Sequence, residues 1–152
     1  MQRRLTWIIL LLATLAVAWS LTHAINLYTQ EQVRESGREW IVEVTLDAMA
    51  SWEAEKLIDH LAPELLDETP ASSWSRYFRS LSALGEWEAV EAVEITAESL
   101  PDWWQGSREA SLDIELRIRF ANDAPTIRTR LHRDEDTWRI RRFQVLTRLL
   151  AA

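Results

Sequence analysis

The residue types that most often carry out enzyme chemistry are rare in this chain of 152 residues. It has no cysteine, which excludes cysteine nucleophiles and thiolate metal sites. Its three histidines, His23, His60 and His132, form neither a His-x-His nor a His-Glu-x-x-His pattern. Three glycines leave little room for a phosphate-binding loop. We therefore expect a protein that is not an enzyme and has no metal site and no cofactor.

One carboxylate interrupts an apolar pattern and is the best candidate for binding a polar ligand. In the segment 87–97 the odd-numbered residues are apolar except for Glu91. A carboxylate held among apolar side chains has a raised pKa and can act as a base or bind a polar group. The alternative is that Glu91 pairs with an arginine or lies at the rim of the apolar face.

Four arginines on the polar face of two neighbouring strands form a candidate interface. A turn centred on residues 123–124 predicts two opposed pairs, Arg117 with Arg130 and Arg119 with Arg128. Like charges directly opposite each other destabilise a sheet. Either local carboxylates and solvent neutralise them, or the acidic surface of a partner or of a second copy does; anionic lipid is a lesser alternative.

Two adjacent tryptophans, Trp103 and Trp104, lie in a predicted turn between Pro101 and Gly106. Strand alternation prevents both from pointing into one core. One of them can cover the open end of the domain while the other is exposed. An exposed tryptophan there can bind a partner or enter a lipid interface.

The first element is an apolar segment. Arg3 and Arg4 precede a run of 17 mostly apolar residues, 5–21, which contains Trp7 and Trp19 near its two ends. This length suits a short membrane-spanning helix, and tryptophan favours membrane interfaces. We expect residues 1–25 to form a membrane anchor, with a cleaved signal peptide as the alternative.

The remaining residues, 26–152, are expected to form one extracytoplasmic α+β domain. The positive-inside tendency puts the N-terminus in the cytoplasm and the domain in the periplasm of a bacterial inner membrane. A chain without cysteine and rich in arginine and alanine is consistent with a bacterial source. The net charge of −7, with an acidic first half, argues against nucleic acid as a partner.

Three helices are predicted at the start of this domain. The first begins near Asn26 and contains Gly37, which marks a weak point or a close approach of another element. A second helical stretch, 53–68, should break before Pro63. A third, 72–84, has Ser72 or Ser73 as its N-cap and ends at Gly85.

An antiparallel meander of four strands follows, because apolar residues then alternate with polar ones. Matching the apolar faces of the second and third strands requires paired residue numbers with an odd sum, and the shortest turn places Phe120 opposite Ile127. The next turn places Leu131 opposite Ile140. In the fourth strand the apolar positions change parity at Arg141, which predicts a β-bulge and a curved sheet.

This order of elements resembles the nuclear-transport-factor-2-like (cystatin-related) superfamily over roughly residues 30–150. The resemblance rests on LDAMASWEAEKLIDHLAPELL as the first helix pair, YFRSLSALGEW leading into the first strand, and DTWRIRRFQV as the closing strand. In that superfamily the sheet wraps the first helix and forms a conical pocket. Its members include isomerases and dehydratases as well as domains that dimerise or scaffold.

The resemblance implies a pocket lined by Trp40, Trp87 and Trp138, with Glu91 inside or at its mouth. If these tryptophans fill the cone, no space is left for a ligand. A membrane anchor followed by such a domain also resembles the inner-membrane scaffold subunit of type IV secretion systems. We expect a membrane-anchored binding or scaffolding domain that contacts a protein partner or a second copy; the alternative is a small-molecule-binding or isomerase-like pocket protein.

Overall fold

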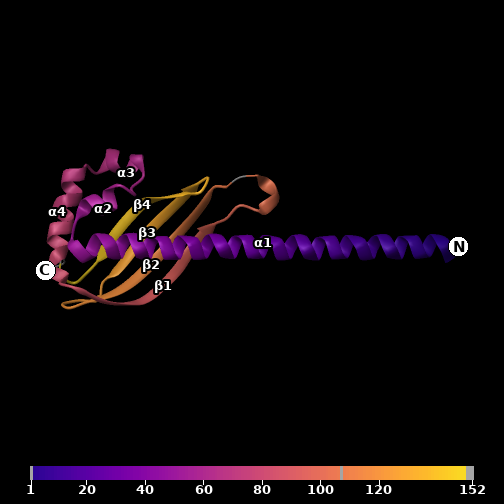
Figure 1. The fold of residues 1–152 in the computed structure, drawn as a ribbon, viewed down its shortest axis with the longest axis horizontal. Coiled ribbons are helices and arrows are strands. Elements are labelled where there is room, and N and C mark those ends of the chain that lie inside the picture. The colour runs from indigo at the N-terminus through magenta and orange to yellow at the C-terminus, as the bar shows by residue number, and fades with distance from the viewer. Residues whose placement is uncertain (1, 107, 150–152) are drawn as a thin grey trace.

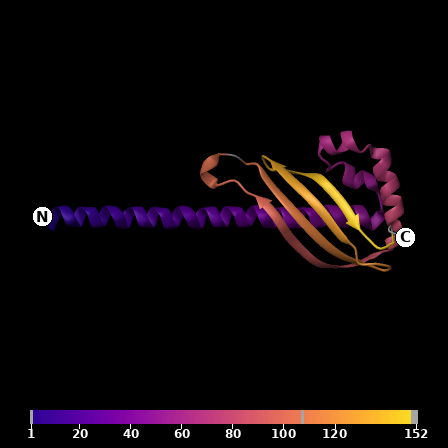
Figure 2. The ribbon, with the colours of Figure 1, turned by 180° about the vertical axis from the view of Figure 1, so that it is seen from behind.

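A computed structural model describes residues 2–106 and 108–149, and its longest element is one unbroken helix. Helix α1 (Gln2–Ser51) has 50 residues, so at 1.5 Å per residue it is about 75 Å long. Figures 1 and 2 show its C-terminal part lying along a curved sheet and its N-terminal part projecting from the domain. The predicted boundary at residues 25–26 falls inside this single helix.

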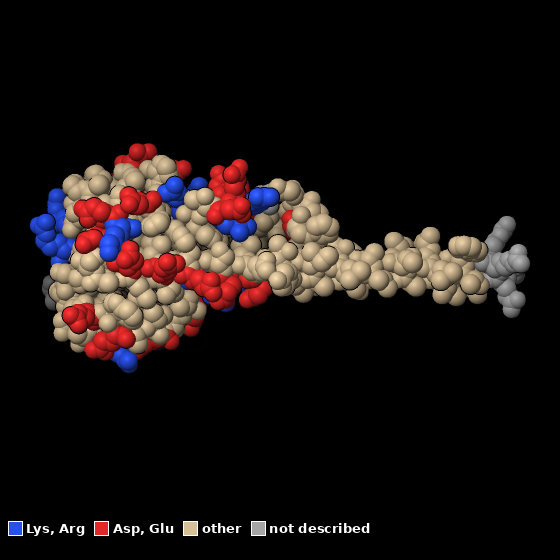
Figure 3. All heavy atoms as spheres, viewed as in Figure 1, with Lys and Arg blue, Asp and Glu red and all other residues tan. Residues whose placement is uncertain are grey.

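The projecting part of α1 is long and apolar enough to span a membrane. Its most apolar window of 18 residues has a mean hydropathy of 2.1, and the domain buries none of it. In Figure 3 the tan-coloured length of this projecting helix shows neither acidic nor basic atoms. Burial begins at Asn26 and then recurs at Val33 and Ile41.

Three short helices follow and cover one end of the domain. Helix α2 (Ala54–Ile58) and helix α3 (Pro63–Glu68) are separated at Ala62, which confirms the predicted break before Pro63. Helix α4 (Ala71–Leu81) and the short 3₁₀ helix η1 (Ser82–Leu84) end at Gly85, where φ is +83°. The N-cap prediction is wrong, because α4 begins at Ala71 and Pro70 occupies the N-cap position.

The sheet is the predicted four-stranded antiparallel meander, with strand order β1-β2-β3-β4. Its strands are β1 (Trp87–Ser99), β2 (Ala110–Phe120), β3 (Thr126–Asp134) and β4 (Thr137–Leu146). The strands curve around α1 (Figure 1). This arrangement confirms the predicted α+β class: a long apolar N-terminal helix, short helices and a curved sheet.

The register between β2 and β3 differs from the prediction by four residues. Arg117 lies opposite Thr126, so the connecting loop is longer than the two-residue turn that the pattern suggested. The opposed arginine pairs are therefore wrong: Asp113 faces Arg130, and Glu115 faces Arg128. A shift of four preserves the apolar face, and it replaces like charges by opposite ones.

The predicted features of β4 are confirmed. Leu131 lies opposite Ile140, and the register changes between Leu131 and Arg130, which faces Arg142. This leaves Arg141 as the extra residue of a bulge. Near this point the edge of β4 is covered by the chain between α2 and α3, since Ile140 N–H donates to His60 O at 2.9 Å and Ala62 N–H donates to Ile140 O at 2.8 Å.

The core lies between α1 and the concave face of the sheet. Ile41 and the sheet residues Leu112, Ile114 and Leu116 are fully buried. Gly37 is the point of closest approach: a Cβ atom added there would lie 2.4 Å from Leu112 Cδ1 and 3.3 Å from the Trp138 ring. The predicted close approach at Gly37 is thus confirmed.

Candidate functional site

Glu91 lies on the outer face of the sheet and does not point into the core. Strand β1 has register shifts between Trp87 and Ala89, between Val90 and Ala92 and between Ile95 and Ala97. A bulge adds a residue and reverses the alternation that follows it, so Glu91 leaves the apolar face. Its Oε1 atom lies 3.3 Å from Arg119 Nη1. This is the alternative position weighed above, an ion pair with an arginine.

The three tryptophans expected around a pocket lie in different surroundings. The Trp40 ring packs edge-to-face on His60, with 5.4 Å between the centroids. Trp138 is buried against Gly37, and its Nε1–H donates to Ser36 Oγ at 3.1 Å. Trp87, at the start of β1, is 40% exposed.

The space between α1 and the sheet is filled by apolar side chains. Val44 and Ala48 of α1 are buried there together with Leu112 and Ile114 of β2. At Gly37 there is no space for even one more methyl group, because an added Cβ atom would lie 2.4 Å from Leu112 Cδ1. Side chains packed in this way fill the space between α1 and the sheet.

The arginines on the outer face are largely neutralised by carboxylates of neighbouring strands. Arg130 binds Asp113 through two hydrogen bonds of 2.7 and 2.8 Å, and Arg128 Nε donates to Glu115 at 2.7 Å. The Arg130 guanidinium holds the pKa of the Asp113 carboxyl below its usual range. Arg117 makes no ion pair with any residue that the structure describes.

The tryptophan turn is docked on α1 by one asparagine. The short 3₁₀ helix η2 (Trp103–Gln105) is capped by the side chain of Asp102. Asn26 of α1 donates from Nδ2 to Asp102 Oδ1 at 3.0 Å and accepts the Trp103 N–H at 3.2 Å. Trp103 and Trp104 are 47% and 57% exposed and contact each other edge-to-face. Asn26 was missed by the sequence reasoning, although it is the first amide side chain after the apolar run.

An ion pair attaches the C-terminal end of β1 to α1 close to this turn. Arg34 binds both carboxylate oxygens of Glu98 at 2.7 Å. Glu98 and a further bond to Glu31 raise the pKa of Arg34, and Arg34 lowers the pKa of Glu98. No spacing rule could have identified this pair, because 64 residues separate its partners.

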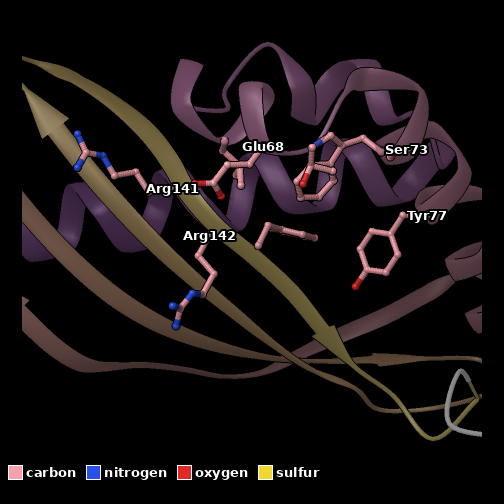
Figure 4. A pocket seen from close by; sticks show the side chains of 9 residues that line it. Glu68, Ser73, Tyr77, Arg141 and Arg142 are labelled. Atoms are coloured by element: carbon pink, nitrogen blue, oxygen red, sulfur yellow. The ribbon is translucent and has the colours of Figure 1, made fainter.

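A groove of about 330 Å³ lies between α3, α4 and β4 (Figure 4). It is lined by Ser73, Trp74 and Tyr77 of α4 and by Arg141 and Arg142 of β4. In Figure 4 the two guanidinium groups point in different directions, away from Tyr77. Glu68 of α3 also lines the groove, so charged groups of both signs border it.

The polar groups of this groove are partly satisfied. Tyr77 Oη accepts the N–H of Val145 at 2.9 Å, and burial raises the pKa of the Tyr77 hydroxyl. The indole nitrogen of Trp74 is buried and has no hydrogen-bond partner among the described residues. A buried N–H without a partner costs free energy.

Five carboxylates recur every four residues on the exposed side of α1: Glu31, Glu35, Glu39, Glu43 and Asp47. Arg34 binds Glu31 at 3.0 Å and Arg38 binds Glu35 at 3.2 Å. Glu39 and Glu43 form no ion pair with the residues that the structure describes. This row is a solvated charged surface rather than a defined site.

The histidines do not combine into a catalytic or metal-binding group. His60 contacts Trp40, whereas His132 lies in β3 opposite Ser111 and Arg139. Over the described residues, no three histidine, aspartate or glutamate side chains are arranged to hold a metal ion.

Comparisons with known proteins do not extend this description. No family model matches the sequence, and no curated protein matches it.

Proposed function

We propose that this chain is a membrane-anchored, non-catalytic binding or scaffolding domain of a bacterial inner membrane. The observation that carries the proposal is the dual use of α1. Its first part is an exposed apolar helix, and its continuation, through Ile41 and Ala48, is the central helix of the domain core. A domain built directly on its anchor is held at a constant distance from the membrane, which suits a scaffold.

The orientation follows from the charges beside the span. Arg3 and Arg4 precede the apolar run, and the acidic residues begin with Glu31 on the other side. The positive-inside tendency then assigns the N-terminus to the cytoplasm and the domain to the periplasm. The α+β arrangement around α1 is also the support for a relationship with the nuclear-transport-factor-2-like superfamily.

The groove between α3, α4 and β4 is the surface through which we propose that the domain binds its protein partner. Helix α4 lies at the end of the domain away from the projecting helix (Figure 1). The groove has Arg141 and Arg142 at its border, together with Glu68 of α3. A peptide segment with a carboxylate would bind the two guanidinium groups.

Site-specific photocrosslinking in intact cells tests this proposal. A photoreactive residue at Ser73, inside the groove, should give one discrete adduct. The same residue at Arg79, exposed on α4 and not part of the groove lining, is the matched control and should give none. The added change Arg142→Glu should abolish the Ser73 adduct.

The outcomes separate the possible partners. An adduct of twice the chain mass identifies a second copy, and another recurring mass identifies a different protein. Equal crosslinking at both positions, or none at either, would contradict binding through the groove. If the solubilised full-length protein is recovered only as a homodimer, a scaffold for other proteins is contradicted.

A further inference from the structure

We infer that the Trp103–Trp104 turn is a second membrane contact, inserted at the level of the lipid headgroups beside the point where α1 leaves the bilayer. This inference rests on the proposed insertion of α1 in a membrane. It adds an interaction surface and a partner of stated chemistry, the lipid interface.

The position of the turn along α1 is the first argument. A hydrocarbon core of about 30 Å takes up roughly 20 helical residues. If it begins at Leu5, it ends near residue 24. The headgroup layer on each side adds about 5–7 Å, or about four more residues. Asn26, which holds the turn, lies within that layer.

The second argument is the arrangement of the turn itself. Figures 1 and 2 both show η2 as the part of the domain that extends farthest along α1 toward the N-terminus. Its two indole rings are about half exposed, and the side chains beside Asn26 on α1, Leu27 and Tyr28, are exposed as well. Tryptophan and tyrosine are the residues that bilayer interfaces favour.

The third argument is that the side-chain amide of Asn26 has its hydrogen bonds within the protein. An amide close to a hydrocarbon core is costly unless it is hydrogen-bonded. Both ends of the Asn26 amide are used, one by Asp102 and one by the Trp103 N–H, and its residue is only 9% exposed. The same two bonds fix the turn, and with it the two tryptophans, at this depth.

Charged side chains near the turn do not explain the proposed contact with lipid. The cavity beside the turn is bordered by Asp102 and Asp136 as well as Arg108 and Arg133. Because both signs are present, this end of the domain has no preference for an anionic headgroup. The contact is therefore made by the indole rings and should not depend on lipid charge.

Fluorine NMR of the full chain tests the inference. The protein is labelled with 5-fluorotryptophan and placed, one copy per disc, in phosphatidylcholine nanodiscs. Trp19→Phe, Trp87→Phe, Trp103→Phe and Trp104→Phe variants assign the four resonances that the test compares. A water-soluble gadolinium chelate should broaden Trp103 and Trp104 severalfold less than Trp87, although the exposed fractions of Trp103 and Trp87, 47% and 40%, are similar. A phosphatidylcholine with a spin label near its headgroup should broaden both, and adding anionic lipid should change neither result.

Trp19 separates failure of this inference from failure of the proposed function. If Trp19 is shielded from gadolinium but the two turn tryptophans are as accessible as Trp87, the turn does not contact lipid and α1 still spans the membrane. If Trp19 is accessible, both ideas are overturned. Shielding of Trp103 and Trp104 without broadening by the spin-labelled lipid would mean that protein covers them, which also overturns the inference.

Discussion

At the residue scale, the pairing of Asp113 with Arg130 makes a specific contribution to pH-dependent stability. Arg130 lowers the pKa of the Asp113 carboxyl in the folded protein. A carboxylate with a depressed folded pKa stabilises the fold above its unfolded pKa, and that stabilisation is lost as the pH falls through the folded pKa. We predict that Asp113→Asn lowers the free energy of unfolding at pH 7, and that the difference from the natural protein disappears in acid.

Urea unfolding of the detergent-solubilised chain, followed over pH, measures this difference. Asp136→Asn is the matched control, because Asp136 and Arg108 are strongly exposed and 3.5 Å apart. Well-exposed pairs contribute little, so the control should change stability less. An equal effect of both substitutions, or an Asp113 effect that persists in strong acid, contradicts the prediction.

Asn26 holds the tryptophan turn on α1 through two hydrogen bonds. Asn26→Ala removes the acceptor of the Trp103 N–H and the donor to Asp102. Each lost hydrogen bond costs about 1 kcal/mol, and the cost falls on the turn rather than on the core. We predict faster amide hydrogen exchange in residues 102–105. Ser75→Ala on α4 is the control, since that hydroxyl donates to Ala71 O of its own helix, and it should leave the exchange unchanged.

At the scale of elements, sequence periodicity predicted which elements form but not how two of the strands pair. The break at Pro63, the bulge at Arg141 and the pairing of Leu131 with Ile140 all follow from local pattern. The β2–β3 register does not, because every register with an odd sum satisfies the apolar face equally. The opposite charges of Asp113 and Arg130, which face each other only in the observed register, distinguish it from the predicted one.

The candidate site was less predictable than the fold. Glu91 interrupts the alternation of β1 only if the strand is regular, and three register shifts make it irregular. Bulges depend on how a strand curves around its neighbours, which one segment of sequence does not report. The tryptophan turn was recognised from Trp103 and Trp104. Its attachment to Asn26 crosses 77 residues and depends on the tertiary fold.

Gly37 gives a test of how closely α1 and β2 pack. We predict that Gly37→Ala destabilises the fold by about 1 kcal/mol, because overpacking typically costs 1–3 kcal/mol and better helix propensity returns just under 1 kcal/mol. The new methyl group would meet Leu112 Cδ1 at 2.4 Å. Thermal unfolding followed by circular dichroism measures the change.

The Leu112→Val background should reduce this loss of stability. Valine has no Cδ1 atom, so Gly37→Ala should there cost clearly less, although the Trp138 ring, 3.3 Å from the added Cβ atom, still opposes the methyl group. The same loss of stability in both backgrounds would show that the Leu112 contact is not the cause.

At the scale of the whole molecule, one helix joins an apolar segment that is long enough to span a membrane to the core of the domain. The ion pair between Arg34 and Glu98 and the Asn26 bonds attach β1 and the tryptophan turn to α1 where it enters the domain. A helix held in this way cannot bend freely between bilayer and domain. We therefore propose that the domain is mounted rigidly on the apolar part of α1.

A single distance tests that claim. The chain has no natural cysteine, so spin labels at Leu12→Cys and Glu39→Cys report only on α1. These positions are 27 residues apart, which in a continuous helix corresponds to about 40 Å. Pulsed electron–electron double resonance in nanodiscs should give one narrow distribution near that distance. A broad or clearly shorter distribution, or a mature protein without residue 12, would contradict a rigid helix that both anchors and builds the domain.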